Sequence, residues 1–410
     1  MPVSNPGYLP LLPTRDSYFN FLEGYSTPTV QDLQDHRSRR LLVKSYMLET
    51  VSHDSKSPDL RSMFPGNVVL DSIDEQLFRI SDISDPSKVW GLLEVPTTRF
   101  PIIYTTLEAN TSDAWIHRMI ESSPWLDRMW LSAPILYQLW QYVQATTPSH
   151  RFVRLGFEHE AIYETSSESN VNEDVDFADE HDQEDSFSIA AHERRHSRVQ
   201  LTEQLGVLQS KLPKLLDIYN PLQSLIQLQM PSSSKGGHLF NYNGKVTNRS
   251  DSFLEHRSTV GLVSRLYENV TNGAEDRLWM DAEADGFGGL SLVGSPVTVT
   301  FGESLSESTF ERLVTLGLQR RTSRFRIGGF LERRGPTKIH MAAIDRHLWQ
   351  PFLLEATTSQ LVAVLPRGTC GNTINRLVTN VQRLVDPTAQ IWLGSEKYSE
   401  VVATSFGVAA

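Results

Sequence analysis

Alternation of apolar and polar residues with a period of two, which predicts half-buried strands, marks five segments in the front part of the chain. They lie at 67–70, 77–80, 89–95, 102–107 and 151–164. Apolar residues three and four positions apart predict helices around these strands. The helical segments lie at 32–51, 112–121 and 133–145, with a further stretch opening at Pro124. The mixture of short strands and helices predicts an α+β fold.

The back part has the same mixture in a more regular order. Apolar spacing predicts a helix over 194–216, a hairpin at 226–247 around Asn243-Gly244, and a helix opened by a capping box of Ser252 and Glu255. From residue 297 the pattern predicts one strand, a helix, four strands and a closing helix. Their ranges are 297–301, 308–319, 324–330, 337–344, 351–356, 361–365 and 373–384, and a short strand follows at 390–393.

A curved antiparallel sheet that grips a helix would bury this last pattern. The β-α-β-β-β-β-α order resembles one repeat of the TATA-binding-protein or helix-grip type of fold. The resemblance lies in the topology of the segment from residue 297 onward and in no sequence motif. It therefore implies an architecture and says little about activity.

A strongly acidic tract separates the two parts. Residues 165–190 hold nine Asp and Glu, no Lys or Arg, and few apolar residues. Such a composition cannot bury enough apolar surface to offset the entropy of ordering, so we expect a disordered linker. We therefore predict an α+β module with Trp-rich helices at 1–164, the linker at 165–190, and a second α+β module at 191–410.

Composition restricts the function classes. The single cysteine, Cys370, excludes an intramolecular disulfide and favours a reducing, cytoplasmic location. We find no signal-peptide pattern and no apolar run of about 18 residues, so we expect a soluble, intracellular protein without a membrane partner. The net charge of −11 is uneven, because residues 1–198 hold 17 Lys and Arg against 30 Asp and Glu, whereas residues 199–410 hold 21 against 19.

Tryptophan is concentrated in the predicted helices of the front module. Four of the eight tryptophans lie there, at Trp115, Trp125, Trp130 and Trp140. Aromatic side chains at helical spacing usually fill a core, so we interpret this segment as a buried helical pair. The alternative is a platform on which nucleic-acid bases stack.

One short motif resembles a zinc site. The segment from His192 to His196 (HERRH) fits H-E-x-x-H, which on a helix places two histidines on one face for zinc and a glutamate beside the bound water. Both intervening residues are arginines, whose charge opposes that of zinc, and no third ligand follows at a family spacing. We interpret the segment as an exposed, charged helix start, with zinc hydrolysis as the alternative.

A second motif resembles a phosphate-binding loop. Cys370 and Arg376 (CGNTINR) have the Cys-x5-Arg spacing of tyrosine-phosphatase-type enzymes, in which a thiolate lies at a helix N-terminus and the arginine clasps phosphate. This loop lacks the glycines that turn several amides inward, and no histidine precedes the cysteine. We favour a helix start whose amides bind an anion over a catalytic cysteine.

A third segment is acidic. Asp281, Glu283 and Asp285 alternate, so a strand would place their carboxylates on one face, where they could hold Mg²⁺ or Ca²⁺. A metal-dependent hydrolase or nuclease is therefore an alternative function, and a polar loop is the simpler interpretation. The chain has no Walker loop and no dinucleotide-binding glycine pattern, so we expect no cofactor.

The strongest signal is a basic cluster between residues 320 and 346, where Glu332 and Asp345 oppose eight cations. These are Arg320, Arg321, Arg324, Arg326, Arg333, Arg334, Lys338 and Arg346. Arginine suits bidentate recognition of phosphate, and Gly328 and Gly329 would let a backbone approach closely.

We therefore predict an accessory subunit of a multi-subunit complex that binds DNA, RNA or another polyanion through a basic sheet of the second module. One alternative is a non-catalytic scaffold that docks a protein partner. Another is that the cluster has no ligand, because it lies on a solvated sheet face or pairs with acidic residues of the front module.

Overall fold

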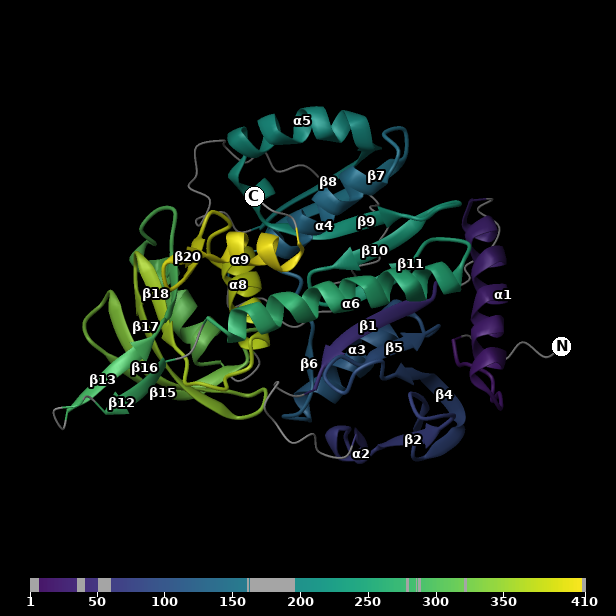
Figure 1. The fold of residues 1–410 in the computed structure, drawn as a ribbon, viewed down its shortest axis with the longest axis horizontal. Coiled ribbons are helices and arrows are strands. Elements are labelled where there is room, and N and C mark those ends of the chain that lie inside the picture. The colour runs from purple at the N-terminus through teal and green to yellow at the C-terminus, as the bar shows by residue number, and fades with distance from the viewer. Residues whose placement is uncertain are drawn as a thin grey trace.

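The computed structural model describes most of the chain and confirms an α+β fold with two antiparallel sheet units (Figure 1). The described residues are 7–34, 41–50, 60–160, 162, 196–277, 280–284, 286, 289–320 and 323–407. The acidic tract at 165–190 lies outside them. Within the described residues, no helix has both the length and the apolar character needed to cross a bilayer.

The first sheet has eleven strands among the described residues, in the order β2-β3-β4-β5-β1-β11-β10-β9-β7-β8, with β6 paired to β1. The strands are β1 (Lys44–Glu49), β2 (Val68–Ser72), β3 (Leu77–Asp82), β4 (Asp85–Glu94), β5 (Ile102–Thr105), β6 (Asp127–Arg128), β7 (Phe152–Glu160), β8 (His196–Gln204), β9 (Leu225–Pro231), β10 (Gly237–Asn241) and β11 (Lys245–Asn248). The four front-part strands predicted between 67 and 107 correspond to β2, β3, β4 and β5.

The predicted helix over 32–51 is wrong in its second half, where residues 44–49 form β1. Every residue of β1 is buried, because the strand lies in the middle of the sheet between β5 and β11. A strand covered on both faces loses its period-two pattern, and its apolar run then resembles one face of a helix. The helix at this end of the chain is α1 (Arg15–Gln34).

The predicted helix over 194–216 is also half wrong, because β8 occupies residues 196–204 before α5 (Leu205–Ile218) begins. β8 pairs with β7 along nine consecutive positions, from Phe152 with Gln204 to Glu160 with His196. The strands on either side of the acidic tract are therefore sheet neighbours. The predicted module boundary at 165–190 does not separate the two sheets, since the first sheet continues to residue 248.

The second sheet has the order β15-β16-β17-β18-β14-β19-β20 and confirms the strand and helix order predicted from residue 297 onward. Its strands are β14 (Val297–Thr300), β15 (Ile327–Arg333), β16 (Lys338–Asp345), β17 (Gln350–Thr357), β18 (Gln360–Val364), β19 (Gln390–Leu393) and β20 (Glu396–Lys397). A separate hairpin pairs β12 (Met280–Ala284) with β13 (Leu290–Gly294). The helical segment after β14 begins with α7 (Glu307–Arg312), continues as a π-helix (Leu313–Leu318), and is capped by Ser306.

The longest described helix, α6 (Phe253–Glu275), runs across the first sheet towards the second (Figure 1). The Ser252 Oγ accepts a hydrogen bond from the Glu255 amide at 3.1 Å, which confirms the predicted N-cap. The remaining helices are α2 (Leu60–Met63), α3 (Ala109–Glu121), α4 (Ala133–Thr146), a 3-10 turn (Asn220–Gln223), α8 (Asn372–Leu384) and α9 (Tyr398–Ser405).

Three of the four tryptophans in the segment that we predicted as the front-module helices are core residues, as predicted. Trp115, Trp130 and Trp140 are each 5% exposed, whereas Trp125 is partly exposed. The helix expected from Pro124 is absent, because residues 127–128 form β6 against β1. The three buried rings are thus unavailable as a stacking platform for nucleic-acid bases.

α8 lies between the two sheet units and is buried along almost its whole length (Figure 1). Its apolar residues join one continuous hydrophobic core to which both sheets contribute. Its polar residues contact charged groups of the first unit, as Arg376 does with Asp127 and Arg383 with Glu158. An amphipathic helix therefore has both of its faces covered, the apolar one by core residues and the polar one by buried ion pairs.

Gly329 in β15 permits the close approach that the sequence predicted, although the approaching backbone is that of β16. Gly329 has φ +144°, and a Cβ there would lie 2.1 Å from the Ala342 carbonyl oxygen, whereas a Cβ at Gly328 would meet nothing nearer than 4.0 Å. We expect Gly329→Ala to lower the free energy of unfolding by about 1–3 kcal/mol. Gly328→Ala is the matched control. Denaturant titration of both variants would measure this, and equal losses would contradict it.

Candidate functional site

The polar face of α8 is held by a buried ion-pair network at the junction of the two units. The Arg376 guanidinium pairs with Asp127 of β6 and, at 2.5 Å, with Asp345 at the end of β16. Asp127 also accepts from Arg326 Nη1 at 3.2 Å. Burial opposes ionisation of Asp127, yet the two arginines hold its pKa well below the usual range. The carboxylate is therefore a fixed negative charge between the sheets.

A second buried arginine on α8 forms a similar contact about two turns further along. Arg383 Nε donates to Glu158 at 2.9 Å, and Arg383 also donates at 2.9 Å to Glu160 and to the Tyr242 hydroxyl. Its guanidinium lies 4.5 Å from the centre of the Tyr242 ring. The acidic front half and the more basic back half of the sequence thus pair with each other inside the molecule.

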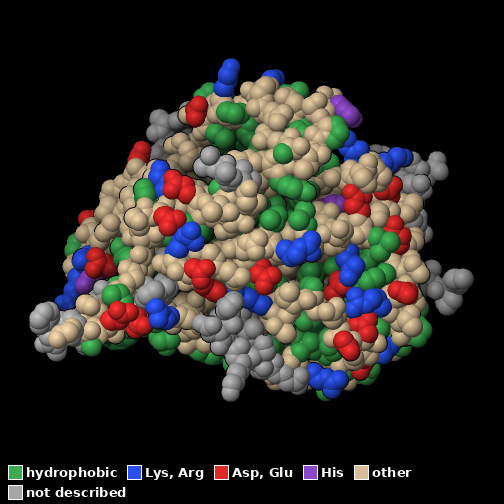
Figure 2. All heavy atoms as spheres, in the orientation of Figure 1, with side chains coloured by type: hydrophobic (Ala, Val, Ile, Leu, Met, Phe, Trp, Pro, Cys, Tyr) green, Lys and Arg blue, Asp and Glu red, His purple; other side chains and the backbone are tan. Residues whose placement is uncertain are grey.

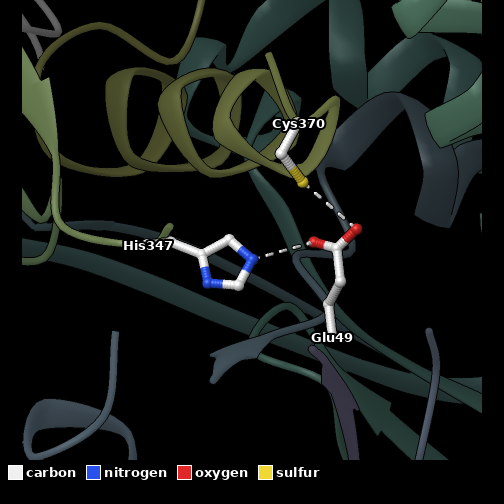
Figure 3. A group of neighbouring side chains, drawn as sticks. All are labelled: Glu49, His347 and Cys370. Carbon is white, nitrogen blue, oxygen red and sulfur yellow. Dashed lines mark hydrogen bonds and ion pairs between the residues drawn. The ribbon is translucent and has the colours of Figure 1, made fainter. Parts of the chain in front are cut away.

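Next to this network, Glu49, His347 and Cys370 converge from three elements (Figure 3). Glu49 ends β1 in the first sheet, His347 follows β16, and Cys370 precedes α8. The Cys370 thiol donates to Glu49 Oε1 at 3.3 Å, and His347 Nε2 lies 3.8 Å from Glu49 Oε2. All three side chains are fully buried, and their ligand atoms lie within 4.8 Å of one another.

An ion pair lies beside this cluster. Arg99 Nη2 is 2.7 Å from Glu49 Oε1 and 2.5 Å from Glu275 Oε1, and it approaches the Cys370 sulfur at 3.8 Å. Burial nevertheless outweighs Arg99 and raises the pKa of Glu49 to about 7. Burial also raises the pKa of the Cys370 thiol and lowers the pKa of His347 to about 4. Without a further cation, the thiol and the imidazole are therefore neutral near pH 7.

Three atoms of this cluster lack hydrogen-bond partners among the described residues. They are Glu49 Oε2 and both ring nitrogens of His347. A buried polar atom that loses its water without gaining a partner costs about 1–3 kcal/mol, and native proteins rarely leave such atoms unsatisfied. Carboxylate, imidazole and thiolate are also the three side-chain groups that zinc prefers.

The predicted anion site at the start of α8 exists, but the chain itself fills it. The amide of Gly371 donates to the Glu275 carboxylate at 2.8 Å, and the amide of Cys370 donates to Gln350 at 2.8 Å. Arg376 points at Asp127 and Asp345. The resemblance to a phosphatase loop is therefore wrong in its geometry, because the arginine and the amides already have internal partners.

The other predicted metal sites are not assembled in the described residues. His192 and Asp285 lie outside them, and of the H-E-x-x-H motif only His196 is described, where it begins the strand β8. Asp281 and Glu283 lie on the β12–β13 hairpin, where Asp281 is 3.9 Å from Arg367. Among the described residues, the metal ligands that a hydrolase would need are therefore not assembled around residues 281–285.

The eight cations of the predicted basic cluster have diverse surroundings. Arg326 is buried and donates to the carbonyls of Leu126 and Ile120, so it is closed to an outside ligand. Four others pair with carboxylates: Arg324 with Glu160, Arg333 with Glu311, Arg334 with Glu332, and Lys338 with Glu355. Arg346 donates to the carbonyl of Arg320 at 3.5 Å, and Arg321 lies outside the described residues.

The Glu49–His347–Cys370 cluster could not be found from the sequence. Its members come from strands and loops that are far apart in the chain, and they become neighbours only when the end of β1 meets the second sheet. Of the three, only Cys370 carried a local motif. The one sequence feature that indicated the ion pairs around α8 was the difference in net charge between the two halves of the chain.

Comparison with known proteins places this chain in a family. It is 27% identical over 161 residues to the uncharacterized protein MJECL33 of Methanocaldococcus jannaschii, a match that covers 39% of this chain and 36% of that protein. No solved structure matches significantly. The model of the family described as MJECL33-like protein matches residues 18–400. Because this match covers nearly the whole chain, the chain belongs to the MJECL33-like protein family.

Proposed function

We propose that this protein is an accessory subunit that binds a single strand of DNA or RNA across the outer face of its second sheet. The observation that carries the proposal is an apolar row on that face. Phe330, Ala342 and Leu353 are directly opposed on neighbouring strands, and Phe330 is 76% exposed and Leu353 60% exposed. Exposed aromatic and aliphatic side chains on a sheet offer surfaces on which bases stack.

Cations at one end of this row support the proposal. Arg346 Nε lies 4.0 Å from the Cβ position of Gly328, which is two residues from Phe330, so its guanidinium lies on the same face. Arg346 also contacts the exposed Arg320 through the carbonyl of that residue. Arginine next to a stacking surface suits a ligand that carries both phosphates and bases.

The proposal is narrower than the sequence prediction. Of the original cluster it retains Arg320 and Arg346 and adds Phe330 and Leu353, while Arg326 becomes a structural residue. On the face that Figure 2 shows, Lys and Arg side chains are interspersed with Asp and Glu over the described residues. Binding would therefore be local to one sheet face and modest in affinity, because few cations contribute.

We expect the full-length chain to bind fluorescein-labelled single-stranded oligonucleotides at low salt, with affinity falling about tenfold between about 50 and about 200 mM salt. Phe330→Ala should weaken binding about tenfold, since stacking contributes about 1–3 kcal/mol per base. Arg346→Ala should also reduce the salt dependence. Arg334→Ala, at a cation paired with Glu332, is the matched control. Fluorescence anisotropy measures all four, and absence of binding at low salt would refute the proposal.

A protein-docking scaffold is the second candidate, favoured by the apolar character of the same row. Leu353 of this row and Ile344 on the same sheet face are both exposed, and their side chains are aliphatic rather than aromatic. If a purified partner binds this face, Leu353→Ser should abolish the interaction, and the affinity should change little with salt. A salt-independent interaction that Arg346→Ala leaves unchanged would favour the scaffold over the nucleic-acid function.

A further inference from the structure

We propose that Glu49, His347 and Cys370 bind one zinc-type divalent metal ion at the junction of the two sheets. The three residues offer a carboxylate oxygen, an imidazole nitrogen and a sulfur, all of them groups that zinc accepts. The site is independent of nucleic-acid binding, because it lies in the interior, whereas the proposed binding face is the exposed side of the second sheet.

The spacing of the donor atoms fits a small tetrahedral ion. Zinc lies about 2.3 Å from sulfur and about 2.0–2.2 Å from nitrogen or oxygen, so its tetrahedral ligands are about 3.3–3.8 Å apart. Here the Cys370 sulfur is 3.3 Å from Glu49 Oε1, and His347 Nε2 is 3.8 Å from Glu49 Oε2. Figure 3 shows the thiol and the imidazole directed at opposite oxygens of the same carboxylate. The three ligand atoms lie within 4.8 Å of one another, so side-chain rotations would bring them closer when one ion binds.

An ion would satisfy two of the atoms that lack hydrogen-bond partners among the described residues. Glu49 Oε2 and His347 Nε2 are both fully buried and face each other. In the imidazole tautomer that carries its proton on Nδ1, both facing atoms are acceptors, and a metal ion between them would satisfy both. Coordination would remove the desolvation cost of both atoms at once.

The charges balance when a divalent ion is present. The thiol of Cys370, which donates to Glu49 in the metal-free arrangement, would lose its proton to solvent as the ion binds. One dication with a thiolate, a carboxylate and a neutral imidazole has zero net charge. The adjacent Arg99 and Glu275 form their own neutral pair at 2.5 Å. A buried site of this kind therefore carries no uncompensated charge.

The ligands come from both units, so the ion would join the two sheets. Glu49 belongs to the first sheet, and His347 and Cys370 flank elements of the second. The three protein ligands leave a fourth tetrahedral position for water. A cysteine nucleophile activated by His347 is the competing explanation. It is less favourable because Cys370 is fully buried and hydrogen-bonded to a carboxylate.

The test is metal analysis of the full-length chain, purified without chelators in the presence of a reductant. We expect about one zinc per chain, and we expect Co²⁺ to replace it with a thiolate-to-cobalt charge-transfer band. Cys370→Ser should lose that band, and His347→Gln should lose stoichiometric metal. His256→Gln removes another fully buried histidine and is the matched control, which should retain both.

A folded wild-type chain that holds no stoichiometric zinc and gives no cobalt band on titration would overturn the proposal. This result does not depend on the variants, so it stands even where Cys370→Ser or His347→Gln fails to fold. Metal retained in full by both folded variants would overturn it as well. Neither result bears on binding of an oligonucleotide to the outer face of the second sheet, which is measured separately.

Discussion

Replacing Arg376 with methionine is expected to lower the free energy of unfolding by about 3–5 kcal/mol, because it removes the guanidinium that two buried carboxylates share. Asp127 keeps Arg326 as a partner, whereas Asp345 loses its arginine. Asp127 and Asp345 are both fully buried, and both pair with this one guanidinium. Methionine matches most of the arginine volume, so the loss reports the missing charge rather than a cavity. Such a change is a large fraction of the stability of an ordinary protein.

The matched control is Arg333→Met. Arg333 also forms an arginine–carboxylate pair, at 2.7 Å from Glu311, but both side chains are more than 40% exposed. Pairs exposed in this way contribute about 0–1 kcal/mol. Chemical denaturation of both variants, monitored by tryptophan fluorescence and by circular dichroism, measures the difference. Similar losses for the two variants would contradict the assignment of Arg376 as the residue that holds the units together.

Acidification from pH 6.5 towards pH 4 is expected to destabilise the protein through the paired histidines His238 and His256. Their Nδ1 atoms lie 3.3 Å apart, and His256 Nε2 is 2.7 Å from the Ser45 hydroxyl. Burial lowers the pKa of His238 to about 4, and burial together with His238 lowers the pKa of His256 well below 6.5. Both imidazoles are therefore neutral in the folded chain over most of this range.

The direction of the effect follows from the proton balance. Below pH 6.5 these histidines become protonated in the unfolded chain but stay neutral in the folded chain. The free energy of unfolding therefore falls as the pH falls, until the folded histidine is also protonated. For His238 the total is about 3 kcal/mol. The raised pKa of Glu49 acts in the opposite direction between pH 4.5 and about 7, whereas the lowered pKa of His347 acts in the same direction as the two paired histidines. The three histidines therefore outweigh the one carboxyl.

The measurement is the free energy of unfolding as a function of pH in the wild type and in a double variant, His238→Gln with His256→Gln. The double variant should have a flatter profile between pH 4 and 6.5. His340→Gln changes a partly exposed histidine that contacts Glu355 at 2.8 Å, and its profile should follow the wild type. An unchanged slope in the double variant would show that other groups dominate the acid response.

Local patterns predicted the second sheet well, because its outer face is exposed and each strand keeps a clear alternation. β16, for example, alternates buried and more exposed residues from Lys338 to Asp345. The Ser252 cap was also predictable, since its hydrogen bond to Glu255 spans only three residues. Both features depend on residues that are close together in the sequence, so a local sequence pattern can predict them.

Features that depend on distant pairing could not be predicted in the same way. β1 is buried on both faces and so resembles a helix in its pattern, and β8 belongs beside β7 across the acidic tract. The basic cluster is visible in the sequence, but whether Arg326 faces solvent or Asp127 depends on the packing of β6. The cluster of Glu49, His347 and Cys370 forms only when both sheets are folded, so no single sequence segment indicates it.

The central position of β1 also has a consequence for biosynthesis. β1 is translated well before β11, with which it pairs through Lys44 and Thr247. Until the chain has been translated past residue 248, one edge of this wholly buried strand has no native partner, and sequence-distant pairings of this kind fold slowly. Pairing of β1 along both of its edges is therefore complete only after β11 has been translated.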